Sequence, residues 1–192
     1  MSDSAPAERL LEALARRRAT GARLTAAAAP AATLAQVRDW GATRVLAPDE
    51  PLLDELGVID ALRAANIEVL RWPAGRAGGW RELLGLEGPT DTVALTTPDL
   101  AVAERGTLVL AAEARRGRSL DAVCERHLAV LPASRIRLTL ADALREQFAP
   151  GRPVASAVSL VSAPSRTSDI EKISTLGAHG ALSLHVLVVE DR

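Results

Sequence analysis

Short, continuous apolar runs separated by helical segments constrain the fold of this chain more than any other feature. Strands buried on both faces carry such runs, whereas strands with one wet face alternate apolar and polar residues. The runs expected to form strands are Thr43–Ala47, Ile67–Trp72, Thr92–Thr96, Thr107–Ala112, Arg135–Leu140, Val158–Val161 and Leu184–Val189. Because helical segments lie between them, we expect an α/β fold with an open, mostly parallel sheet and flanking helices.

Proline, glycine and leucine spacing place the helices between these runs. The expected helices are an N-terminal one capped by Ser4, Pro30 to Trp40 with Gly41 just beyond it, Pro51 to Asn66 with a break near Gly57, and Ala141–Phe148. The glycine-rich segment Pro73–Pro89 is expected to be a loop with a short helix around Trp80–Leu84.

Size and charge exclude several classes of protein. The 192 residues correspond to one domain at about 150 residues per domain. With 24 acidic and 23 basic residues the net charge is −1, which excludes the strongly basic surface of a nucleic-acid-binding protein. The apolar run Leu182–Val189 is short and is interrupted by His185, so we expect no membrane-spanning segment. His185 is expected to be a hydrogen-bonded core histidine.

A single cysteine, Cys124, limits the redox and metal chemistry of the chain. It excludes an internal disulfide, a cysteine-rich zinc site and a four-cysteine iron–sulfur cluster held by this chain alone. One thiol and no signal peptide favour the reducing cytoplasm. Cys124 and His127 have the spacing of two metal ligands on a helix, but no further ligand lies nearby in the sequence. A metal site is therefore the weaker alternative.

The stretch from Ser162 to Glu171 carries the strongest local signal for binding. We expect a strand to end near Ser162 and a helix to begin after Ser168, which has capping-box spacing to Glu171. Ser165, Arg166 and Thr167 then lie where backbone N–H groups and a helix dipole favour an anion. Arg166 could bind a carboxylate or phosphate in a bidentate manner. The alternative is a capped helix with a solvated arginine.

Two further segments contain candidate functional residues. In Asp99–Thr107, Glu104 is a candidate base or nucleophile, and Gly106 and Thr107 open the next strand. In the turn Gly177–Gly180, the glycines allow close approach of a ligand and His179 can titrate near neutral pH. The alternatives are a solvated hairpin and a turn that merely accommodates its histidine.

Taken in order, these three segments resemble the LUD (lactate-utilisation) domain family, in the form found in lactate utilization protein C. The matching residues are Asp99, Ala101, Ala103, Glu104, Gly106, Thr107, Pro164, Ser165, Arg166, Thr167, Asp169, Ile170, Glu171, Gly177, His179 and Gly180. The resemblance runs from about Arg23 to the C-terminus, after an N-terminal helical segment of residues 1–22. Arg105 and Ala163 depart from the family pattern, which usually has threonine and glycine there.

The resemblance implies an open α/β sheet of the NagB/RpiA/CoA transferase-like type, which is related to Rossmann folds. It also implies a cytoplasmic system that oxidises L-lactate to pyruvate, in which partner proteins carry the iron–sulfur clusters. This chain would then be a non-redox subunit that holds no cofactor by itself and binds a small carboxylate or phosphate. The alternative is a stand-alone enzyme or binder for a phosphorylated or CoA-type molecule, with Glu104 as the active carboxylate. Whether this chain is itself an enzyme stays open.

Overall fold

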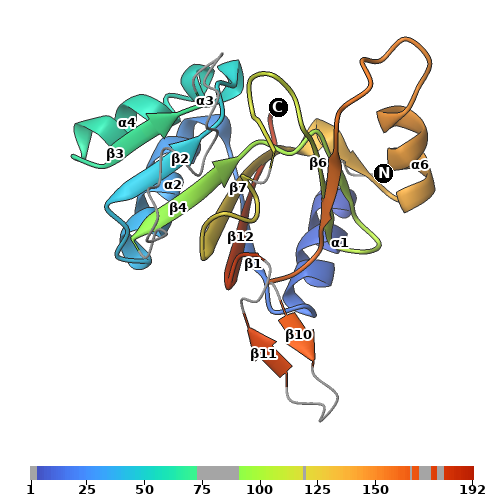
Figure 1. Ribbon diagram of the computed structural model, residues 1–192, viewed down its shortest axis with the longest axis horizontal. Helices are drawn as coiled ribbons and strands as arrows, with labels where there is room; N and C mark the ends of the chain where they lie inside the picture. Colours follow the sequence, from blue (N-terminus) through green and yellow to red (C-terminus); the bar gives the residue numbers. More distant parts are fainter. Residues whose placement is uncertain (1–3, 73–90, 119, 165, 169–173, 177–179) are drawn as a thin grey trace.

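The computed structural model describes residues 4–72, 91–118, 120–164, 166–168, 174–176 and 180–192 (Figure 1). Within these residues, the central element is a parallel sheet of six strands in the order β1-β12-β7-β4-β2-β3. Its strands are β1 (Thr20–Leu24), β2 (Arg44–Ala47), β3 (Glu68–Arg71), β4 (Thr92–Thr96), β7 (Arg126–Pro132) and β12 (Ser183–Val189). Every neighbouring pair is parallel, which confirms the parallel sheet predicted from the apolar runs.

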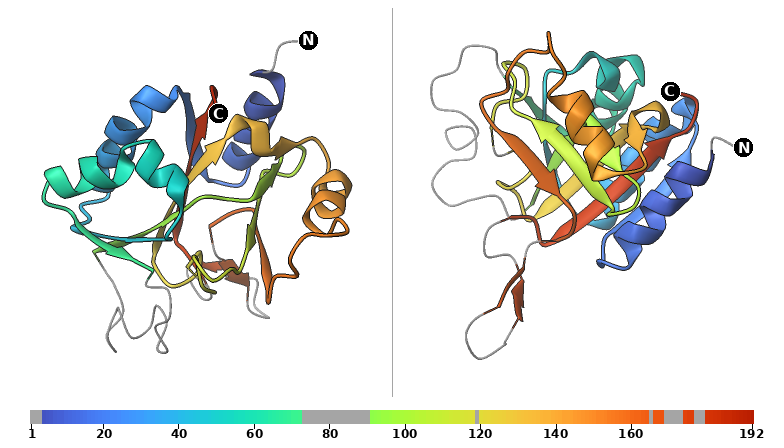
Figure 2. Two further views of the ribbon diagram at one scale, coloured as in Figure 1. Left: turned by 90° about the horizontal axis from the view of Figure 1, so that it is seen from above. Right: turned by 90° about the vertical axis from the view of Figure 1, so that its right-hand side faces the viewer.

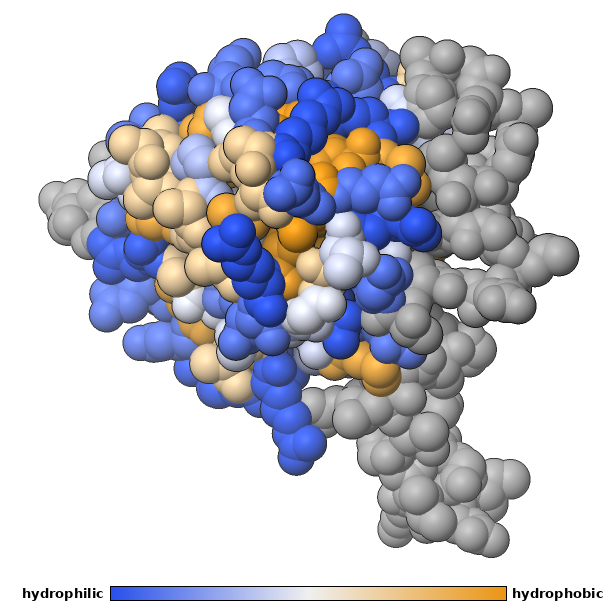
Figure 3. Space-filling model, turned by 90° about the vertical axis from the view of Figure 1, so that its left-hand side faces the viewer, coloured by the Kyte–Doolittle hydropathy of each residue, from blue (hydrophilic) through white to orange (hydrophobic). Residues whose placement is uncertain are grey.

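Helices cover one face of this central sheet (Figures 1 and 2). They are α2 (Ala29–Asp39), preceded by a 3-10 turn at Ala26–Ala28, α3 (Pro51–Glu55) and α4 (Val58–Ala64). Val37, Leu53 and Ile59 from these helices belong to one buried cluster with Val130 of the sheet. Gly57 separates α3 from α4, which confirms the expected break, and it adopts the left-handed conformation. On this side of the molecule, hydrophilic residues are interspersed with hydrophobic ones (Figure 3).

The opposite face is covered by α1 (Ser4–Ala15) and by a second sheet (Figure 2). Among the described residues this sheet has four strands in the order β8-β5-β6-β9. They are β5 (Leu100–Val102), β6 (Thr107–Ala111), β8 (Ile136–Arg137) and β9 (Val158–Val161). Leu10 and Leu14 of α1, Leu108 of β6 and Val186 of β12 form a buried cluster between the layers. The sequence analysis did not predict this second sheet.

Two details of the local structure in this part of the chain contradict the sequence analysis. The helix proposed for Cys124 and His127 is wrong, because His127 lies in the central strand β7. The strand expected over Arg135–Leu140 is mostly wrong: a 3-10 turn ends at Arg135, β8 has two residues, and α6 (Leu140–Gln147) begins at Leu140. The side chain of Thr139 caps α6 by accepting a bond from Asp142 N, and that cap stops the strand.

After β9 the chain forms a small antiparallel pair that lies apart from both sheets (Figures 1 and 2). It consists of β10 (Arg166–Ser168) and β11 (Ser174–Leu176), with Ser168 opposite Ser174. The helix predicted to begin after Ser168 is therefore wrong at Ser174–Leu176, where strand pairing satisfies the backbone. Residues 169–173 and the loop with its short helix predicted within 73–90 lie outside the described residues.

Candidate functional site

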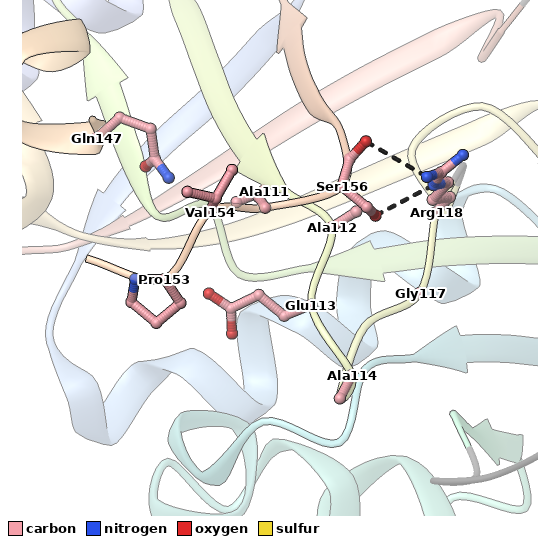
Figure 4. A pocket seen from close by; sticks show the side chains of 11 residues that line it. Ala111, Ala112, Glu113, Ala114, Gly117, Arg118, Gln147, Pro153, Val154 and Ser156 are labelled. Atoms are coloured by element: carbon pink, nitrogen blue, oxygen red, sulfur yellow. Dashed lines mark hydrogen bonds between the residues drawn. The ribbon is translucent and has the colours of Figure 1, made fainter. Parts of the chain in front are cut away.

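A crevice runs between the central sheet and the second sheet. Three of its cavities have volumes of about 540, 160 and 210 Å³, here called the first, second and third cavity. The first two share Arg118 among their lining residues, and the second and third share Asp121. Figure 4 shows the first cavity, with Glu113, Gln147 and Val154 around it and two hydrogen bonds from Arg118 to Ser156.

His127 is one of the residues that line this crevice. It is fully buried in β7 opposite Ala94 of β4, and it lines the third cavity. Its Nε2 lies 2.7 Å from Thr96 Oγ1, at the carboxyl end of β4. Thr96 and Asp121 line the adjoining second cavity. Two neighbouring parallel strands thus bring a hydroxyl and an imidazole together that are 31 residues apart in the chain.

Burial determines the charge of this imidazole. Loss of solvation lowers the pKa of His127 to about 4, although the carboxylate of Asp121 acts in the opposite direction. The ring is therefore neutral at neutral pH, with one nitrogen as a donor and the other as an acceptor. A neutral buried imidazole can bind or orient a polar ligand, whereas it cannot supply a positive charge for an anion.

The low pKa makes the stability of the protein depend on pH. The unfolded chain takes up a proton at His127 below about pH 6.5, and the folded chain resists this until about pH 4. At about 1.4 kcal/mol per pKa unit, this difference removes on the order of 3 kcal/mol of stability as the pH falls between these values. Urea unfolding should show a shallower pH dependence for His127→Gln than for the wild type. Equal slopes would show that His127 is not held neutral by the fold.

Two of the three sequence motifs reach the third cavity. Thr107 is buried, and its Oγ1 lies 2.7 Å from the Oγ of Ser162. Ser162 lines the third cavity together with Gly180 and with Ala163, one of the two departures from the family pattern. Antiparallel pairing of β6 with β9 brings Thr107 and Ser162 together, 55 residues apart in the chain. The predicted ligand-binding residues Thr107 and Gly180 thus lie at or next to one cavity.

Glu104 and Gly106 lie in the turn between β5 and β6, and both contact helices. The carboxylate of Glu104 accepts a hydrogen bond of 3.1 Å from Leu140 N and so holds the first turn of α6. Its neighbour Arg105 is exposed, with Nε 3.9 Å from the Glu104 carboxylate. Gly106 has a positive φ and packs directly on the backbone of α1. Neither Glu104 nor Gly106 lines any of the three cavities.

Other predicted site residues are described in part or not at all. Arg166 and Thr167 form the backbone of β10. Ser165, Gly177 and His179 lie outside the described residues. The predicted catalytic role of His179 and the anion-binding roles of Ser165, Arg166, Thr167 and Gly177 therefore stay predictions.

The remaining cysteine and histidine have ordinary packing roles. Cys124 is buried against Leu46 and Leu120, and burial raises the pKa of its thiol to about 12. It is protonated at neutral pH and unsuited to ligating a metal or cluster. Within the described part of the chain, no three His, Cys, Asp or Glu side chains gather as metal ligands. His185 is only partly buried and is hydrogen-bonded to Thr20, at 2.7 Å.

The sequence analysis missed three polar residues that line the crevice. His127 was considered only as a metal ligand with Cys124, and Thr96 and Asp121 received no role. The sequence signals of His127 and Thr96 are weak: the histidine begins an apolar run, and the threonine ends another one. Only strand pairing shows that these residues meet.

The fold and crevice define an α/β protein with a cleft between a parallel sheet and a smaller mixed sheet. Residues 7–189 match the LUD domain family, and the chain belongs to that family. In the described residues, no helix has the length and apolar character needed to cross a membrane.

Several relatives align with most of the length of this chain. The chain is 31% identical over 166 residues to Lactate utilization protein C from Geobacillus kaustophilus (strain HTA426), covering 82% of this chain and 67% of the relative. It is 30% identical over 168 residues to the uncharacterized protein YkgG from Escherichia coli (strain K12), covering 86% of this chain and 71% of the relative. The chain thus spans about two thirds of the length of these proteins.

A solved structure supports the fold. A DUF162 family protein from Deinococcus radiodurans superposes with a TM-score of 0.64 at 21% identity, covering 98% of this chain and 99% of that chain. At this identity the likeness concerns the fold alone, and it confirms the α/β architecture.

Proposed function

We propose that this chain serves lactate utilisation as the non-redox subunit of a cytoplasmic system that oxidises L-lactate to pyruvate. The observation that carries the proposal is the family match over residues 7–189, which includes every residue lining the crevice, together with relatives named Lactate utilization protein C. Oxidation of lactate to pyruvate releases two electrons and two protons, so the system needs an electron acceptor. Iron–sulfur partner proteins are proposed to supply it.

The chemistry of this chain supports a role without electron transfer. The thiol of Cys124 is buried and protonated, as argued above, so it neither ligates a cluster nor exchanges disulfides readily. The crevice instead offers hydrogen-bonding side chains around a cavity of small-molecule size. Within the proposal, this chain binds the acid or docks a partner, and Arg166 contacts a carboxylate or cofactor phosphate.

Deletion and complementation in the source organism test this function. Cells without the chain should fail to grow on L-lactate while growing normally on pyruvate, and the wild-type chain should restore growth. Affinity purification of tagged protein from lactate-grown cells should yield iron-containing partners and lactate-dependent dye reduction. Normal growth of the deletion strain on L-lactate would refute the proposal.

Arg166→Ala should lower the lactate-dependent activity about tenfold, because a charge-assisted hydrogen bond contributes roughly 1.5–3 kcal/mol and 1.4 kcal/mol is a factor of ten. Arg145→Ala is the matched control, since Arg145 is exposed on α6 and pairs only with Asp142 among the described residues. Equal activity of the two variants would exclude a binding role for Arg166. If the protein purifies alone, thermal shift with CoA, nucleotides and sugar phosphates tests the stand-alone binder.

A further inference from the structure

The Nδ1 atom of His127 is a buried polar atom with no hydrogen-bond partner in the part of the chain that the structure describes. Nε2 of the same ring is bonded to Thr96. Leaving a buried polar atom unpaired costs about 1–3 kcal/mol, and such atoms are rare in folded proteins. His127 lines the third cavity, so a ligand that enters this cavity and displaces the atoms covering Nδ1 can supply the missing partner.

The neutral ring restricts the group that can occupy this position. A neutral imidazole nitrogen pairs with a hydroxyl or a carbonyl oxygen, donating or accepting according to its tautomer. Asp121 lines the same cavity and its charge acts on His127. A carboxylate alone would be repelled there, whereas a hydroxyl could also donate to Asp121. The site therefore favours the uncharged oxygen of a ligand at His127.

The second cavity, which adjoins the third, contains a positive charge. Arg118 lines the second cavity, and its hydrogen bonds go to the neutral oxygens of Ser156. No ion pair among the described residues neutralises it. Arg116 lines that cavity too, but Asp99 and Glu50 compensate its charge. The third cavity itself is lined by no arginine, and it shares Asp121 and Ala122 with the second cavity. An acid whose uncharged oxygen lies at His127 therefore meets the charge of Arg118 only where its carboxylate extends into the second cavity.

We propose that the third cavity binds a small 2-hydroxy or 2-oxo acid, with the hydroxyl or carbonyl oxygen of the acid hydrogen-bonded to Nδ1 of His127. The choice of acid rests on the proposed function, for which L-lactate and pyruvate are the members of this class. Nδ1 is covered in this structure, so binding displaces a neighbouring group.

Nitrogen NMR of the histidine rings tests the site on the isolated full chain. The sequence has three histidines, so the ring signals are few, and His127 is assigned by its loss in a variant. Titration with L-lactate or pyruvate should shift the Nδ1 signal of His127 saturably. His185 is the internal control, because it faces α2 and Trp40 on the other side of the central sheet. No shift at His127 with either acid means that only water fills the cavity and overturns the proposal.

Two substitutions distinguish the contributions of the two ring nitrogens to binding. In His127→Gln the amide extends to the Nε2 position, so the contact with Thr96 can persist while the group at Nδ1 is lost. In His127→Asn the amide lies near the Nδ1 position. We expect His127→Gln to weaken binding at least about tenfold, the value of one hydrogen bond of about 1.4 kcal/mol. His127→Asn should stay within a few-fold of the wild type. Equal affinities in the two variants would overturn the contact through Nδ1.

A third variant tests the site while leaving His127 unchanged, so its result does not depend on whether the His127 variants fold. Ala122 is exposed and lines both the second and the third cavity, so Ala122→Leu narrows the site without emptying the core. It should abolish the response of His127 to the acids, and an unchanged response would place binding elsewhere. The growth experiment separates this proposal from the function: a growth defect without binding refutes only the site, and binding without a growth defect refutes only the function.

Discussion

Gly106→Ala is expected to remove several kcal/mol of folding stability. Gly106 has a φ of +60°, and a left-handed conformation costs a residue with a Cβ about 1–2 kcal/mol. A Cβ at this position would also lie 2.8 Å from the backbone of α1, at Ala13 C and Leu14 N. Because backbone atoms cannot rotate away, α1 would have to shift off the second sheet, where Leu10 and Leu14 are fully buried.

Gly41→Ala is the matched control for this prediction. Gly41 has nearly the same φ, +63°, but no atom lies within 4 Å of its added Cβ. It should lose only the conformational cost of about 1–2 kcal/mol. Urea unfolding followed by tryptophan fluorescence measures both variants. If Gly106→Ala is no less stable than Gly41→Ala, the contact with α1 contributes nothing. The predicted role of Gly106 in ligand binding would then be the better explanation of this glycine.

Arg116→Met is expected to cost about 3–5 kcal/mol, the range for breaking a buried ion pair. Arg116 is 4% exposed, and its guanidinium bonds Asp99 at 2.6 Å and Glu50 at 2.9 Å. Burial opposes this charge, but the hydrogen bonds and charges of Asp99 and Glu50 outweigh it and raise the pKa of Arg116. Without the guanidinium, two largely buried carboxylates remain close together and uncompensated.

A double-mutant cycle checks the mechanism of this loss. Asp99 also accepts a hydrogen bond of 2.7 Å from Ala111 N, so Asp99→Asn alone should be destabilising as well. Arg116→Met combined with Asp99→Asn should lose less than the sum of the two changes, by about 0.5–3 kcal/mol, because the isolated carboxylate is gone. Arg145→Met is the control, since Arg145 and Asp142 form an exposed pair worth at most about 1 kcal/mol. Additive losses in the cycle would show that the ion pair is not the cause.

The cluster around Arg116 also explains one residue of the family motif. Asp99 was singled out by its place in the pattern that precedes Thr107, near the expected ligand. In the structure it joins the loop after β4 to Arg116 and to the end of β6. Gly106 and Asp99 both illustrate that a motif residue can stabilise the surrounding structure instead of contacting a ligand.

The strands that sequence analysis found and missed differ in a physical way. β2, β4, β6 and β12 are buried on both faces, so their apolar runs stand out. β1 is an exposed edge strand and has no such run. β7 is central, but it begins with Arg126 and His127, which obscured its start. A site built on a buried strand requires polar residues at the end of that strand. The same polar residues interrupt the apolar run by which the strand is recognised in the sequence.

The sequence by itself determined the α/β class, the parallel sheet and the family, because these follow from local apolar runs and from three short motifs. Only the tertiary structure decided which residues face the crevice. His127 meets Thr96, and Thr107 meets Ser162, through strand pairings between residues 31 and 55 positions apart. Such contacts depend on sheet order and register. Local pattern does not give the sheet order, and the continuous apolar runs of strands buried on both faces lack the alternation that would fix their register.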